Sequence, residues 1–117
     1  MNAELRRIYS PDAADLALWR PDGPSWSLLL QLMVGPADAP GEESFEVTLC
    51  SAAWLQTRAA QDGIVDLRHC FVTENYDYAT VVNFFAARVS RCSGDDWAQV
   101  AAKLSRIGHW EFEDYVG

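Results

Sequence analysis

Residues 26–34 place the strongest constraint on the fold of this chain. Hydrophobic side chains recur there at every second position: Trp26, Leu28, Leu30, Leu32 and Val34. This alternation places the five side chains on one face of a β-strand. Leu29 and Met33 make the other face partly apolar, which is typical of a central strand covered on both sides.

A second alternating segment follows a turn-rich connection with the sequence PADAPGEE. In residues 44–50, Phe45, Val47 and Leu49 alternate with polar residues, so the two segments predict a long hairpin. Three further segments are predicted to be strands: residues 4–10, 67–73 and 109–115. In the first of these, alternation places Leu5 and Arg7 on one face, opposite to Arg6 and Ile8.

Three segments carry signals of helices. Ser51 is a suitable N-cap for a short helix that ends near Gly63. Residues 78–89 have apolar side chains at i, i+3, i+4, i+7 and i+11, the stripe of an amphipathic helix. For the last helix, we predict Ser93 as the N-cap and Gly108 as a left-handed C-cap.

The order of these elements predicts an α+β fold. We expect a mostly antiparallel sheet of about five strands with three helices packed on one side. No linker or composition shift divides the chain, so residues 1–117 are predicted to form a single domain.

The charge of the chain limits its partners. It has 17 Asp and Glu residues against nine Lys and Arg, a formal net charge of −8. Such a surface repels phosphate backbones and anionic membranes, so we expect neither a nucleic-acid nor a membrane partner. It attracts a basic partner at long range, although the same charge also serves simply to keep a protein soluble.

The chain shows no metal-binding or disulfide pattern. Its cysteines, Cys50, Cys70 and Cys92, are odd in number and have no CxxC spacing. Its two histidines, His69 and His109, have no spacing typical of a zinc site. We therefore expect no metal and no cofactor. No apolar signal segment or membrane-length stretch is present, so we expect a cytoplasmic protein.

Catalysis would rest on few residues. Cys50 could pair with His69, but a nucleophilic cysteine needs an electropositive setting, which an acidic chain does not favour. Glu111 and Glu113 would lie about 7 Å apart along a strand, near glycosidase spacing, as in any strand with Glu-X-Glu. A hydrolase that uses these two residues is an alternative, and we expect a protein that is not an enzyme.

Two acidic clusters are the candidate partner-binding residues. The first surrounds the hairpin turn and consists of Asp38, Glu42, Glu43 and Glu46. The second lies near the C-terminus and consists of Glu111, Glu113 and Asp114. In a strand over 109–115, Glu111 and Glu113 would point outward while Trp110 and Phe112 face the core. Carboxylates beside aromatic rings are suited to pair with Arg or Lys of a partner protein.

Three segments resemble one family of proteins. The C-terminal run WAQVAAKLSRIGHWEFEDY resembles the C-terminal signature of the Imm8 family of immunity proteins from bacterial polymorphic toxin systems. The segment GEESFEVTLCSAAWL is similar to the middle portion of that family, and RHCFVTENYDY resembles the strand before its longer helix. These segments occur in the family's order, from Ser25 onward.

The resemblance implies a protein that is encoded beside a toxin gene and blocks the toxin domain by stoichiometric binding. Such toxins are often nucleases with basic substrate grooves, which an acidic domain could occupy as a phosphate mimic. An acidic adaptor or a self-associating structural domain without a toxin partner is the alternative. The sequence leaves the oligomeric state open.

Overall fold

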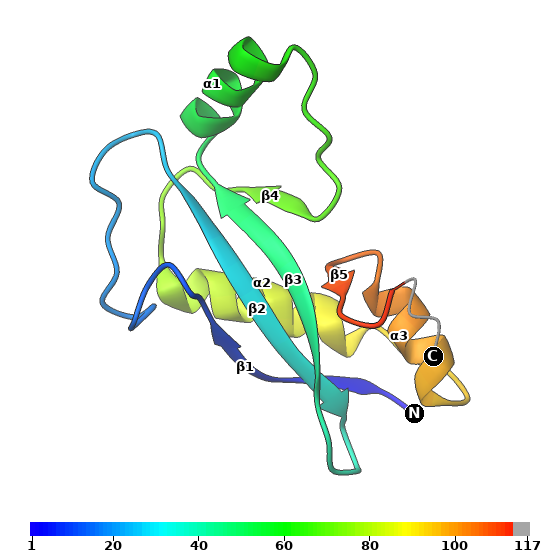
Figure 1. The fold of residues 1–117 in the computed structure, drawn as a ribbon. Helices are drawn as coiled ribbons and strands as arrows, with labels where there is room; N and C mark the ends of the chain where they lie inside the picture. The colour runs from blue at the N-terminus through cyan, green and yellow to red at the C-terminus, as the bar shows by residue number, and fades with distance from the viewer. Residues whose placement is uncertain (114–117) are drawn as a thin grey trace.

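The chain folds into one mixed sheet and three helices, shown in Figure 1 as a computed structural model that describes residues 1–113. In chain order, the elements are β1 (Ala3–Tyr9), β2 (Ser27–Pro36), β3 (Glu43–Cys50), α1 (Ala52–Asp62), β4 (Cys70–Val72), α2 (Tyr78–Ser90), α3 (Trp97–Leu104) and β5 (His109–Trp110). The predicted α+β class with a mostly antiparallel sheet of five strands and three helices is confirmed.

The sheet has the strand order β1-β2-β3-β4, and β5 pairs with β3. All pairs are antiparallel except β3 with β4. Since β2 covers the whole of one edge of β3, both β4 and β5 lie along the other edge. β4 pairs with residues 48–50, and β5 pairs with residues 45–46.

The core lies between the sheet and two of the helices. The alternation predicted for β2 and β3 is confirmed, because Leu28, Leu30, Leu32, Val34, Phe45, Val47 and Leu49 are all buried. Helix α2 covers them with Val81, Phe85 and Val89, and α3 adds Val100, Ala101 and Leu104. None of residues 52–62 is buried, and Figure 1 shows α1 beyond the end of β3 rather than over the sheet.

Strand β1 contains a bulge that its alternation did not reveal. Its register against β2 shifts between Leu5 and Arg7, which leaves Arg6 as an extra residue. As a result, Leu5 and Ile8 both pack against the core, and the prediction that they lie on opposite faces is wrong. The Arg6 guanidinium donates a hydrogen bond to the carbonyl oxygen of Pro36 at 2.6 Å.

Helix α3 begins later than predicted. Its N-cap is Asp96, whose side chain accepts a hydrogen bond from the Gln99 N–H at 2.9 Å. Ser93, the predicted N-cap, instead forms a β-bridge with Asn2 of the N-terminal segment. Ser93 is held in extended pairing three positions before the actual N-cap and cannot cap the helix, so this prediction is wrong.

The predicted left-handed cap at Gly108 is also wrong. The C-cap of helix α3 is Ser105, and Gly41 and Gly63 are the glycines with positive φ among residues 1–113. Gly108 serves a different purpose: a Cβ there would lie 3.1 Å from Phe45 Cβ and 3.1 Å from a methyl carbon of Val47. The missing side chain lets the segment between α3 and β5 lie close to β3.

Two strands are shorter than predicted. His69 has a φ of 61°, in the left-handed region, so the extended segment begins only at Cys70. β5 ends at Trp110, where a turn is closed by a 2.9 Å hydrogen bond from the Glu113 N–H to the Trp110 carbonyl. The prediction of a strand through residues 111–113 is therefore wrong, and its last two residues lie outside the described part of the chain.

Candidate functional site

The two acidic clusters, which lie far apart in the sequence, meet where β3 pairs with β5. The Ser44 N–H donates to Glu111 Oε1 at 2.8 Å, and Trp110 Nε1 donates to Glu43 Oε2 at 2.5 Å. Phe45 and Trp110 are stacked beneath, with ring centroids 6.3 Å apart. We call the joined group the acidic surface: Asp38, Glu42, Glu43, Glu46, Glu111 and Glu113. It includes both sides of the sheet, because Glu43 lies on the same side of β3 as the buried Phe45 and Glu46 lies on the opposite side.

Neighbouring side chains hold the carboxylates of the acidic surface in place. Arg7 on β1 pairs with Glu42 at 2.9 Å. Gln31 on β2 donates to Glu46 Oε2 at 2.8 Å and accepts a hydrogen bond from the Ser44 hydroxyl at 2.5 Å. The partners of these carboxylates therefore come from two other strands, and the sheet itself sets the positions of the charges.

Four of these carboxylates use only one oxygen in the interactions of residues 1–113: Glu42, Glu43, Glu46 and Glu111. An ionised carboxylate accepts about four hydrogen bonds through its two oxygens. Each of the four can therefore still accept an N–H donor from a partner. Their acceptor capacity and fixed positions suit recognition of Arg or Lys.

Glu113 differs from these four because both of its oxygens are bonded. Oε1 lies 2.7 Å from Arg68 Nη2, and Oε2 lies 2.9 Å from His109 Nδ1. Partial desolvation raises the pKa of Glu113, but the Arg68 guanidinium and the His109 ring outweigh it and hold the pKa below its usual range. Glu113 thus orients Arg68 and His109 instead of presenting a free oxygen.

The remaining two predicted site residues have different surroundings. Asp38 is exposed in the hairpin turn between β2 and β3. Asp114 lies outside the described residues. The structure therefore brings together five of the seven predicted carboxylates around the β3–β5 junction, with Asp38 in the adjoining turn.

The thiol of Cys50 lies beside another cysteine and not beside His69, the pairing considered and disfavoured from the sequence. Cys50 is buried, and its Sγ lies 3.7 Å from Cys70 Sγ. Burial, together with the contact to Cys70, raises the pKa of the Cys50 thiol to about 12, so it is protonated at neutral pH. His69 Nε2 instead donates to the Ser105 carbonyl at 2.7 Å. The parallel β3–β4 pairing, absent from the predictions, brings the two thiols together.

The paired-carboxylate alternative also loses its structural basis. Glu111 and Glu113 lie in the turn after β5 and do not share a strand face. Glu111 accepts from a backbone N–H, while Glu113 is paired with two basic groups. A general acid needs a raised pKa, whereas the pKa of Glu113 is lowered.

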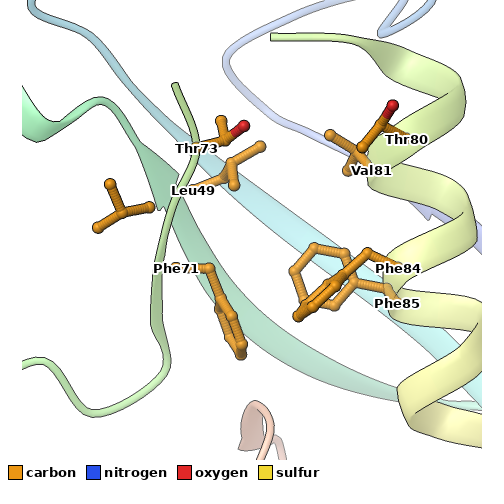
Figure 2. Close-up of a pocket in the computed structure, with 8 residues that line it drawn as sticks. Leu49, Phe71, Thr73, Thr80, Val81, Phe84 and Phe85 are labelled. Carbon is orange, nitrogen blue, oxygen red and sulfur yellow. The ribbon is translucent and has the colours of Figure 1, made fainter. Parts of the chain in front are cut away.

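An apolar hollow of about 150 Å³ lies between β4 and α2 (Figure 2). Its rings belong to Phe71, Phe84 and Phe85, which contact one another edge to face at centroid distances of 5.0–5.7 Å. Phe84 and Val72 on its rim are 43% and 50% exposed. None of its eight lining residues is ionisable, so it offers contact area rather than acid–base chemistry.

No group of three or more metal-ligating side chains converges within residues 1–113. In the same part of the chain, no helix has both the length and the apolar character needed to cross a bilayer.

The sequence profile of the Immunity protein 8 family, Imm8, matches residues 3–115. The chain belongs to this family. The match confirms the resemblance of the three segments and also includes the loop before Ser25. Membership identifies an immunity protein of a toxin system and implies a toxin as its partner. Comparisons with curated proteins and with solved structures give no match.

Proposed function

We propose that this Imm8 protein neutralises one cognate toxin by stoichiometric binding, without catalysis, and that the acidic surface makes the contact. Family membership supports the toxin partner. The observation that supports the surface is the meeting of both acidic clusters at the β3–β5 junction. A nuclease domain with a basic groove is the toxin class that this charge fits best.

Long-range attraction would assist the encounter. A formal charge of −8 accelerates association with a basic partner, most strongly at low salt. The free oxygens of Glu42, Glu43, Glu46 and Glu111 would then accept from Arg or Lys side chains that bind phosphates in the toxin's substrate. Binding in the groove would exclude that substrate.

The internal hydrogen bonds would make this binding more favourable. Long acidic side chains lose rotamer freedom when an interface orders them. Gln31, Ser44 and Trp110 already restrict Glu46, Glu111 and Glu43, so part of that entropy loss has occurred on folding. The proposed surface is thus aligned before the partner arrives.

A co-expression experiment tests the proposal. The C-terminal domain encoded by the neighbouring upstream reading frame is induced in a bacterial host, with and without this protein, and surviving cells are counted. We expect growth arrest with the toxin domain alone and recovery when both are present, with a 1:1 complex on co-purification. Such a protein acts in the cytoplasm of the producing cell, so neither partner needs an export signal in this test.

A lack of rescue by a folded, expressed protein would contradict the proposal. A stable homo-oligomer that shows no affinity for the toxin domain would support the alternative, a self-associating domain. The exposed Phe84 and Val72 of the apolar hollow would be the first contacts to examine in that case.

A further inference from the structure

Four basic side chains surround a hollow of about 170 Å³ in the helical layer of the molecule. Arg88 lies in the last turn of α2, and Arg91 is the C-cap of that helix. Lys103 lies in the last turn of α3. The basic hollow, as we call it, is lined by Arg88, Arg91, Cys92, Lys103, Arg106 and Ile107. Its lining contains no carboxylate.

The other basic residues of the chain all have polar partners. The chain has nine Lys and Arg residues, so four of nine line this single hollow. The remaining five pair with carboxylates or donate to backbone carbonyls: Arg6, Arg7, Arg20, Arg58 and Arg68. Within residues 1–113, none of the four cations of the basic hollow forms an ion pair or donates a side-chain hydrogen bond.

Three of the four positive charges of the hollow act on the Cys92 thiol. Burial raises the pKa of the Cys92 thiol, while Arg88, Lys103 and Arg106 act in the opposite direction. The negative ends of two helix dipoles favour cations here, because α2 and α3 both end at the hollow. Helix dipoles do not, however, explain why a chain with 17 carboxylates places none of them among these cations.

We propose that the basic hollow binds a small anion that carries a phosphoryl group. Arginine presents its N–H donors in a planar fork that matches phosphate oxygens, and three of the four cations are arginines. The net charge of −8 opposes an extended polyanion such as a nucleic acid, and so favours a compact ligand. This proposal does not depend on the toxin partner, because the hollow and the acidic surface share no residue.

A titration followed by NMR tests the site. Inorganic phosphate is added to the ¹⁵N-labelled protein at constant ionic strength, with chloride as the replaced anion, and amide shifts are recorded. We expect saturable shifts, confined to residues 88–93 and 103–108, with a dissociation constant on the order of 1 mM. A mononucleotide, which carries its phosphate on a larger molecule, should shift the same amides.

Two matched double variants distinguish a specific phosphate site from a general effect of positive charge. Arg91→Ala with Arg106→Ala should weaken phosphate binding at least about tenfold. The control removes two cations elsewhere: Arg58→Ala with Arg20→Ala should leave binding within about twofold of the parent. Linear shifts that never saturate, equal loss in both double variants, or shifts produced only by a single-stranded oligonucleotide would each overturn the proposal. The amide spectrum without phosphate checks that both variants are folded.

Discussion

The acidic surface and the basic hollow differ in how their charges are compensated. Each of the five carboxylates at the β3–β5 junction has a hydrogen-bond or ionic partner, whereas the four cations between α2 and α3 have no ionic partner within residues 1–113. Internal bonds fix the positions of charges and suit a broad protein interface. Uncompensated charges around a small cavity instead suit a counterion of similar size.

Gly35→Ala is expected to have the largest effect on the acidic surface while it leaves the basic hollow intact. A Cβ at Gly35 would overlap the carbonyl oxygen of Gly41 across the hairpin turn. We expect a loss of about 3 kcal/mol in the free energy of unfolding by urea and weaker toxin binding. Phosphate binding at the basic hollow should persist, because the hollow lies on other elements.

Gly23→Ala is the control for this variant, since a Cβ at Gly23 would have no atom within 4 Å. It should change stability by less than about 0.5 kcal/mol. Equal stability of the two variants would contradict the described hairpin geometry.

Charge reversal tests whether the acidic surface contacts the toxin. The double variant Asp38→Lys with Glu42→Lys should lower the association rate constant about tenfold at low salt, and less at high salt. Stopped-flow mixing with the toxin domain measures this rate constant.

A control with the same charge change is available on other elements. Asp22→Lys with Asp62→Lys also replaces one exposed aspartate and one acidic partner of a 2.9 Å ion pair, here with Arg58. Its effect should be at most about threefold, from net charge alone. If both double variants slow association equally, the acidic surface has no special role.

Trp110→Phe tests the bond that joins the two acidic clusters. The variant removes the donor to Glu43, and we expect a loss of about 1 kcal/mol in stability. Trp97→Phe is its counterpart, because Trp97 Nε1 is buried without a hydrogen-bond partner in the described structure. Urea unfolding should therefore show a smaller loss for Trp97→Phe; the reverse order would contradict the role given to the Glu43 bond.

The smallest effect is expected from pH at Glu113. Its pKa is lower in the folded protein than the usual 4.5, so the ionised carboxylate stabilises the fold above that pH. This contribution is lost as the pH falls through the lowered pKa. Thermal unfolding of Glu113→Gln should show a lower Tm than the parent at pH 7. The two Tm values should converge in acid. A constant difference at all pH values would show that ionisation of Glu113 is not the source of the stabilisation.

The sequence predicted best the parts of the fold that depend on local alternation. The inward side chains of β2 and β3 follow directly from their period of two. Local patterns failed where distant segments decide the conformation. The pairing of Ser93 with Asn2 moved the start of α3, and the bulge at Arg6 placed Leu5 and Ile8 on the same face of β1.

The sequence predicted which residues belong to the candidate site, but it did not predict how they are arranged in space. The two acidic clusters stand out in the sequence, yet the bonds from Ser44 to Glu111 and from Trp110 to Glu43 span 67 positions. The basic hollow had only a faint signal, basic residues near the ends of two consecutive helices. Their convergence depends on helix packing, which no spacing in the sequence reveals.

Hydrogen exchange of the complex between this Imm8 protein and its toxin domain tests the central claim most directly. We expect slower amide exchange at residues 42–46 and 109–111 in the complex than in the free protein. Residues 88–92 and 103–107, around the basic hollow, should exchange at the same rate in both. Protection confined to the helical layer, with β3 and β5 unchanged, would contradict toxin binding through the acidic surface.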